Sequence, residues 1–181
     1  LLAKQLGVDM FNEQLSGLCL RWLHDSVFSV REAAATNLKN LTEVFGPEWA
    51  SVHVVPELTA STTHASFLRR MTALIAVQNL GSAVSPEVLN AQLVPLILKL
   101  AADPVPNIRF NAAKTVQSLS SRLDAGVVAA QIKPALNTLC EDPDADVRIY
   151  SSQALSSFSQ RKPEPSLAGT CVQFQATSSK K

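Results

Sequence analysis

The sequence is poor in glycine, tyrosine and cysteine, and it carries almost no net charge. Among 181 residues it has six glycines, one tyrosine and three cysteines, and its formal net charge is +1. The few glycines form no glycine-rich loop, so a phosphate-binding loop is excluded. The lysines and arginines are spread along the chain and balanced by acids. This gives no electrostatic reason to bind DNA, RNA or an acidic membrane.

Long apolar runs and paired cysteines are also missing. No apolar run reaches the roughly 20 residues that span a bilayer. The start, Leu1-Leu2-Ala3-Lys4, lacks the basic-then-apolar order of a signal peptide. Cys19, Cys140 and Cys171 include no close pair and leave an odd number, which argues against a disulfide framework. We therefore expect a protein of the cytoplasm or the nucleus.

The residues of a catalytic or metal site are absent as well. His24 lies beside Asp25, but neighbours on a helix point in different directions and no serine nucleophile matches them. His53 and His64 are isolated, and the spacing of Cys19 and His24 is wrong for a zinc site. We expect a structural or surface role for His24. The chain is predicted to be no enzyme and to hold no metal or cofactor.

What the sequence does contain is a repeat of fixed period. Four arginines lie 39 residues apart, since 70−31, 109−70 and 148−109 are all 39: Arg31, Arg70, Arg109 and Arg148. Six residues before each arginine lie Asp25, His64, Asp103 and Asp142. Eight residues before those lie the helix breakers Gly17, Pro56, Pro95 and Pro134. Such a period is the signature of a repeat protein and argues against a compact globular domain.

Each copy has the pattern of a helix, a tight turn and a second helix. In the fourth copy, one apolar stripe precedes the turn and another follows it: Ile132, Leu136 and Leu139, then Val147, Ser151, Ala154, Leu155 and Phe158. Small residues recur where two helices would approach closely, at Ala34, Ala73, Ala112 and Ser151. No segment alternates as a strand would. We predict an all-α solenoid with turns near residues 24–29, 62–67, 102–107 and 141–146.

Prolines and capping residues predict the local shape of each copy. Pro104 and Pro143 should end the first helix, because proline excludes helical angles from the residue before it. The mid-helix breakers should kink the first helix of each copy. Asp146 and Asn107 are expected to cap the second helices, and Ser85 to cap a helix that begins at Pro86.

These turns and the proline-kinked first helices resemble HEAT repeats, which stack side by side with their second helices on a concave surface. The predicted boundaries are the end of a preceding repeat at 1–7, repeats at 8–46, 47–85, 86–124 and 125–160, and a disordered tail at 161–181. The tail is rich in Ser, Lys, Gln and Pro and has too little apolar surface to offset the entropy of ordering. The absence of an initiator methionine, and a start inside an apolar stripe at Leu2 and Leu6, predict a fragment preceded by further repeats.

The chain also resembles a particular family, the scaffold subunit of protein phosphatase 2A, over roughly residues 1 to 158. The matching segments are Gln5-Leu6-Gly7-Val8, Trp22-Leu23, Val30-Arg31-Glu32-Ala33-Ala34, Asn37-Leu38-Lys39, Phe45-Gly46-Pro47-Glu48-Trp49-Ala50, Arg70-Met71-Thr72, Ala102-Asp103-Pro104-Val105 and Asn107-Ile108-Arg109-Phe110-Asn111. The resemblance implies the last four repeats of a curved array of fifteen. The chain departs from the family at His64, where an acid is expected, and in continuing past Phe158 to Lys181.

The recurring arginines and acids predict a structural ladder. Arginine and aspartate on equivalent turns can bond within a repeat or to the adjacent repeat. The ladder is predicted to contain Asp25, Arg31, Asp103, Arg109, Asp142 and Arg148; direct contact of the arginines with a partner is the alternative.

Residues at the turns are the candidates for partner binding. Phe28, Phe67 and Val105 have no evident place in the apolar stripes, and aromatic side chains at a rigid turn suit a binding hot spot. Packing against the next turn is the alternative role. In the resembled family these turns form a ridge that holds the catalytic subunit, while the regulatory B-type subunit contacts earlier repeats. By that resemblance Phe28, Phe67, Val105 and Asn107 occupy contact positions, with Arg70 and Asp144 as polar neighbours.

The function predicted from the sequence is therefore a scaffold segment for a serine/threonine phosphatase. A competing class is a HEAT adaptor of another kind, such as a transport receptor that binds its partners on the concave face. Contacts on the turns would favour the first class, and contacts on the second helices would favour the other.

Overall fold

The computed structural model describes residues 2–159, and within this range the chain forms helices and turns but no strand. The all-α solenoid predicted from the 39-residue period is confirmed. The tail predicted at 161–181 lies outside the described residues.

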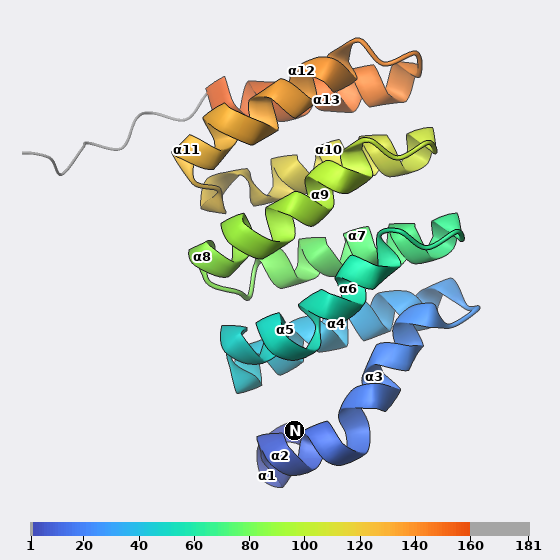
Figure 1. The fold of residues 1–181 in the computed structure, drawn as a ribbon, viewed down its shortest axis with the longest axis vertical. Coiled ribbons are helices and arrows are strands. Elements are labelled where there is room, and N and C mark those ends of the chain that lie inside the picture. The colour runs from blue at the N-terminus through green and yellow to red at the C-terminus, as the bar shows by residue number, and fades with distance from the viewer. Residues whose placement is uncertain (1, 160–181) are drawn as a thin grey trace, which may run out of the picture.

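Four helical units follow one another along the chain (Figure 1). The first unit contains α1 (Leu2–Leu6), α2 (Val8–Phe11), η1 (Asn12–Ser16), α3 (Gly17–Arg21), η2 (Trp22–His24) and α4 (Phe28–Phe45). The second contains α5 (Pro47–His53), α6 (Val55–Ser61) and α7 (Phe67–Gly81). The third contains α8 (Pro86–Val88), η3 (Leu89–Leu93), α9 (Val94–Ala101), α10 (Pro106–Leu119) and η4 (Ser120–Arg122). The fourth contains α11 (Ala125–Val127), η5 (Val128–Ile132), α12 (Lys133–Cys140) and α13 (Ala145–Ser159).

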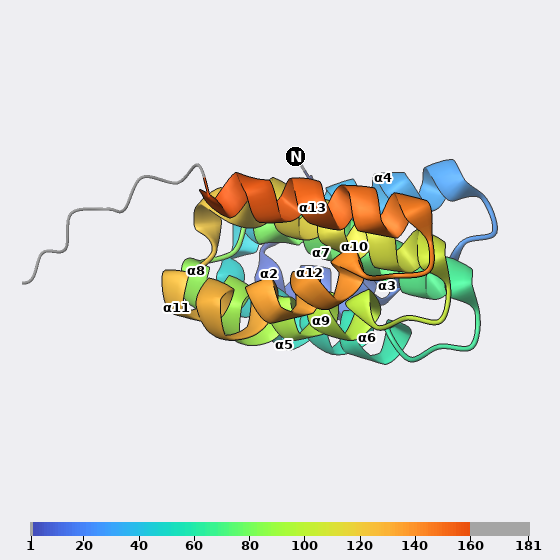
Figure 2. The ribbon, with the colours of Figure 1, turned by 90° about the horizontal axis from the view of Figure 1, so that it is seen from above.

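The units stack so that their helices form two layers. Seen from above, one layer holds the first helices of the units, and the other holds the second helices α4, α7, α10 and α13 (Figure 2). The turns between the two helices of each unit follow one another along one edge of the stack (Figure 1). The stack therefore presents its intra-repeat turns as a row, at the places that the sequence predicts.

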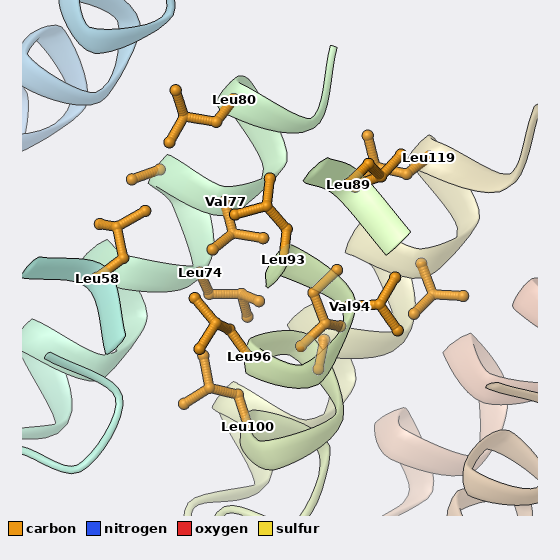
Figure 3. Packing of buried hydrophobic residues seen from close by; sticks show 14 of the residues in the cluster. Leu58, Leu74, Val77, Leu80, Leu89, Leu93, Val94, Leu96, Leu100 and Leu119 are labelled. Carbon is orange, nitrogen blue, oxygen red and sulfur yellow. The ribbon is translucent and has the colours of Figure 1, made fainter. Parts of the chain in front are cut away.

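The core is continuous from unit to unit. Leucines and valines of α6, α7, η3, α9 and α10 meet between the layers, among them Leu74, Leu93 and Leu100 (Figure 3). The small residues at the recurring position of the second helices are all buried: Ala34, Ala73, Ala112 and Ser151. Close approach of the helices requires small side chains at these points, so the buried alanines explain the tight stacking.

The first helices are irregular near each of the predicted breakers, and in the first unit the π-helical segment η1 ends just before Gly17. In the third and fourth units a π-helical segment, η3 or η5, ends just before the helical turn that contains Pro95 or Pro134. A proline has no N–H to donate, so the regular i→i+4 ladder cannot pass through it, and a wider turn accommodates the gap. In the second unit the break falls at Val54, between α5 and α6.

Two short helices begin behind a side chain that caps them. Ser85 caps α8 as predicted, because its side chain accepts a hydrogen bond from the backbone N–H of Val88. Asp124 caps α11, where its Oδ1 accepts from the N–H groups of Gly126 at 2.7 Å and Val127 at 3.2 Å. These bonds satisfy donors that the first helical turn leaves free.

Asp124→Ala is expected to lower the free energy of unfolding by about 1 kcal/mol, because two backbone N–H groups lose their acceptor. Urea denaturation followed by circular dichroism measures the change. Asp124→Asn keeps an oxygen acceptor and should stay within a few tenths of a kcal/mol of the parent. Equal losses in both variants would show that the cap contributes through charge and not through its hydrogen bonds.

Candidate partner-binding ridge

The row of intra-repeat turns is the candidate site, and we call it the turn ridge: residues 24–29, 62–67, 102–107 and 141–146. The backbone of each turn is held by the arginine of its own unit. Arg109 Nη1 donates to the carbonyl oxygens of Asp103 at 2.9 Å and Pro104 at 3.0 Å. Arg31, Arg70 and Arg148 make the same two bonds to the carbonyls six and five residues before them. One recurring side chain thus rigidifies all four turns.

Two of these arginines also form ion pairs with the next unit. Arg70 Nε lies 2.6 Å from Asp103 Oδ2, and its Nη2 lies 3.0 Å from Oδ1. Arg109 makes the matching bidentate pair with Asp142, at 2.7 and 2.8 Å. Both aspartates are buried, so these charge-assisted bonds lie in a place of low solvent screening.

The ion pairs have a consequence for acid stability. The hydrogen bonds from Arg109 lower the pKa of Asp142, and the hydrogen bonds to Asp142 raise the pKa of Arg109. A carboxyl whose pKa is lowered on folding contributes stability above its unfolded pKa and loses it as the pH falls through its folded value. The junction between the third and fourth units should therefore weaken as the pH falls through the folded pKa of Asp142.

Each aspartate has a second role within its turn. Oδ1 of Asp25, Asp103 or Asp142 accepts a hydrogen bond from the backbone N–H two residues later, at 2.8 to 2.9 Å. In the second unit His64 takes over this role, since its Nδ1 accepts from the N–H of Ser66 at 3.0 Å. The histidine preserves the turn but offers no carboxylate to an arginine.

The ladder is therefore shorter than the sequence suggests. Arg31 meets no acid, and its Nε donates to Thr72 Oγ1 of the next unit at 3.0 Å. Among residues 2–159, Asp25 and Arg148 form no ion pair either. The pairing runs from an arginine to the aspartate of the following unit, so Asp25 and Arg148 stand at the two ends of the described stack.

The apolar candidates differ in their exposure. Phe28 is 52% exposed and Phe67 46%, at equivalent positions that begin α4 and α7. Val27 and Leu68 beside them are exposed too. Val105 differs, because it is half-buried and packs against the core. The apolar surface of the turn ridge thus lies on the first two turns.

The polar candidates have structural partners. Asn107 is exposed and accepts a hydrogen bond from Asn111, and the Arg70 side chain is largely buried in its pair with Asp103. The expectation that Asn107 and Asp146 cap the second helices is wrong. Asp144 caps α13 instead: its Oδ1 accepts from the N–H groups of Asp146 at 3.0 Å and Val147 at 3.1 Å. Asp144 takes this role because α13 begins at Ala145, two residues earlier than a cap at Asp146 would require.

Some structural contacts carry no sequence signal. Arg122 donates from Nη1 to the carbonyl of Gly81 and from Nη2 to that of Val84, the latter at 2.6 Å. These bonds connect η4, which contains Arg122, to the segment between α7 and α8. Arg122 has no arginine counterpart in the preceding copy, where Ala83 stands, so the period does not reveal it.

Two other histidines also serve the structure. His24 Nε2 and Glu57 Oε1 lie 2.7 Å apart and join the first unit to α6. The His53 ring lies 5.7 Å from that of Trp49, whose Nε1 donates to Asn12. The structural role expected for His24 fits this contact. Cys19 is buried in the core.

The face of the second helices holds a polar depression. It has a volume of about 470 Å³ and is lined by Gln78, Asn111, Lys114, Gln117, Ser118, Tyr150 and Gln153. Lys114 Nζ lies 5.0 Å from the centre of the Tyr150 ring, close enough for a cation–π contact. This surface is chemically unlike the turn ridge, because amides take the place of exposed phenylalanines.

The outer end of the first unit is apolar. A groove of about 350 Å³ lies between α1, α2, α3 and α4, with Leu2, Leu18 and Trp22 among its lining residues. Trp22 is 40% exposed, whereas Leu100 and Leu139 at the equivalent positions are buried. This end face therefore has the apolar character of the contacts between units.

Residues 2–159 contain no cluster of three or more His, Cys, Asp or Glu side chains suited to a metal ion. Over the same range, no helix combines the length and the apolar character needed to cross a membrane.

Comparison with known proteins agrees with this geometry. The family model described as HEAT repeat matches residues 15–45 and 93–123. The chain carries HEAT repeats. No curated protein matches it. Among solved structures, that of Cex1p matches with a TM-score of 0.68 and 13% identity, over 87% of this chain and 31% of that one. An engineered protein matches with a TM-score of 0.52 and 19% identity, over 83% and 64%.

These likenesses show the fold alone. The chain spans about a third of the length of Cex1p and less than two thirds of the engineered protein. A HEAT-repeat stack is typically non-catalytic, and this scaffold-type fold favours a protein-binding adaptor.

Proposed function

We propose that this chain is a scaffold segment that holds the catalytic subunit of a protein phosphatase 2A type enzyme along its turn ridge. The observation that carries the proposal is the pair of exposed phenylalanines, Phe28 and Phe67, at equivalent tips of two consecutive turns. Large apolar side chains on a rigid backbone bind at low entropic cost, because little has to be ordered on binding. The choice of phosphatase rests on the resemblance of residues 1 to 158 to the scaffold subunit.

The rigidity of the ridge supports a positional mechanism. Each turn is held by its arginine, and the ion pairs from Arg70 and Arg109 join the second, third and fourth units. A surface of this kind can hold one subunit in a fixed relation to another. We propose that a regulatory B-type subunit binds mostly to repeats outside this segment, and that the complex works in the cytoplasm or the nucleus.

The alternative is an adaptor that binds its partners on the second helices. The depression lined by Lys114, Tyr150 and their amide neighbours favours it, since these groups can hydrogen-bond an extended peptide. The turn ridge is the stronger candidate, because exposed phenylalanines provide more binding free energy than solvated amides.

Phe67→Ala should weaken binding of a purified phosphatase 2A catalytic subunit by about 1 kcal/mol, roughly fivefold in Kd, because a ridge contact is truncated. Titration by biolayer interferometry measures it. Lys114→Glu, on the face of the second helices, is the matched control and should bind as the parent does. If Lys114→Glu abolishes binding while Phe67→Ala is neutral, the partner binds to the second helices.

A further inference from the structure

The first two turns contain the same pair of side chains, but the arginine of the pair has different contacts in each. A phenylalanine and an arginine stand three residues apart in each turn, Phe28 with Arg31 and Phe67 with Arg70. In the second turn the Arg70 guanidinium makes the bidentate pair with Asp103. In the first turn the Arg31 Cζ lies 5.6 Å from the centre of the Phe28 ring, within the range of a cation–π contact. Of the described residues, Arg70 forms no such contact with Phe67.

The difference follows from one residue. The acid that would meet Arg31 stands 33 positions later, as Asp103 does for Arg70, and that position holds His64. His64 keeps the turn through its bond from the Ser66 N–H but supplies no negative charge. Arg31 is 7% exposed, and it donates hydrogen bonds to neutral acceptors: Thr72 Oγ1 and the carbonyls of Asp25 and Ser26. Because no carboxylate neutralises the buried Arg31 guanidinium, its positive charge can interact with the face of the Phe28 ring.

The junction between the first two units does not depend on Arg31 for an ionic link. His24 and Glu57 make a polar contact across it at 2.7 Å. The loss of an acid at position 64 thus leaves the stack joined while it changes what Arg31 contacts.

We propose that Arg31 holds the Phe28 ring in place because His64 offers it no carboxylate to pair with. The ring is then already positioned for binding, and it anchors a protein partner that has an apolar pocket. This rests on the proposed function, because the pocket that receives Phe28 is assigned to the phosphatase catalytic subunit. Arg31 is a positioning residue: it acts through the ring that it contacts. A ring fixed before binding loses less rotamer freedom when it enters a pocket.

His64→Asp tests this directly, since it restores the missing acid. Arg31 should turn to the new carboxylate, and the melting temperature should rise while binding of purified phosphatase 2A catalytic subunit weakens about two- to fivefold. His64→Asn is the matched control. Its Oδ1 can accept from the Ser66 N–H but carries no charge, so both the melting temperature and the binding should stay as in the parent.

Two further measurements separate the inference from the proposed function. The ring-current shift of the Arg31 side-chain protons, measured by NMR without a partner, should be lost in His64→Asp and Phe28→Leu and kept in His64→Asn. In a Phe28→Ala background, His64→Asp should cause no additional loss of binding.

If His64→Asp stabilises the stack and removes the ring-current shift but binds as tightly as the parent, Arg31 does not position the ring for binding, while the proposed function stands. If the parent itself does not bind the catalytic subunit, the proposed function fails whatever the NMR spectra show. An unchanged ring-current shift in His64→Asp would overturn the inference itself.

Discussion

Asp103→Ala should lower the free energy of unfolding by about 3 kcal/mol, because it leaves the largely buried Arg70 guanidinium without its acid. The substitution also removes the acceptor for the Val105 N–H. For a chain of this size, such a loss corresponds to a fall in Tm of roughly 6–12 °C. Thermal and urea denaturation of the chain alone, without any partner, measure the effect.

The chain provides its own control in Asp25. Asp25 accepts from the Val27 N–H as Asp103 does from Val105, but it forms no ion pair among the described residues. Asp25→Ala should therefore cost only the turn bond, about 1 kcal/mol. The difference between the two variants isolates the contribution of the Arg70–Asp103 pair. If both variants lose a similar free energy of unfolding, the Arg70–Asp103 ion pair adds no stability beyond the hydrogen bond within the turn.

The fold could be predicted from the sequence because its main determinants recur. A period of 39 residues places an arginine, a breaker and a small residue at equivalent points in every copy, and stacked hairpins are the structure that satisfies such a pattern. The positions of the turns follow from the same period. The period does not determine the form of the irregularity at Pro95 and Pro134, because a kink and a π-helical segment can both accommodate a missing N–H.

The candidate site was predictable only in part, for a physical reason. Exposure of Phe28 and Phe67 follows from their lying outside the apolar stripes, but Val105 fits the core as well, because a small branched side chain at a turn can fold back onto it. The different state of Arg31 could not be foreseen. His64 interrupts the aspartate pattern visibly, yet only the side-chain geometry shows that it keeps the turn bond and leaves Arg31 against Phe28.

Phe28→Ala should weaken binding of a purified phosphatase 2A catalytic subunit by about 2 kcal/mol, roughly thirtyfold in Kd. Phe28 has the most exposed ring of the turn ridge, and it starts α4, where the backbone is fixed by Arg31. Its truncation removes apolar contact area without touching the core, so the helical content and the melting temperature of the free chain should stay close to those of the parent. Isothermal titration with the catalytic subunit, with melting curves alongside, measures both properties.

Leu38→Ala gives the opposite pattern and completes the test. Leu38 is buried in the middle of α4, on the same helix as Phe28, so its truncation should cost about 3 kcal/mol of stability through the cavity that it leaves. Well below its lowered melting temperature, Leu38→Ala should still bind within about twofold of the parent, because the turn ridge keeps its shape while the unit is folded. A binding surface and a core residue are thereby separated on one helix. Normal binding by Phe28→Ala, together with loss of binding by Lys114→Glu on the surface of the second helices, would show that the partner recognises the second helices and not the turns.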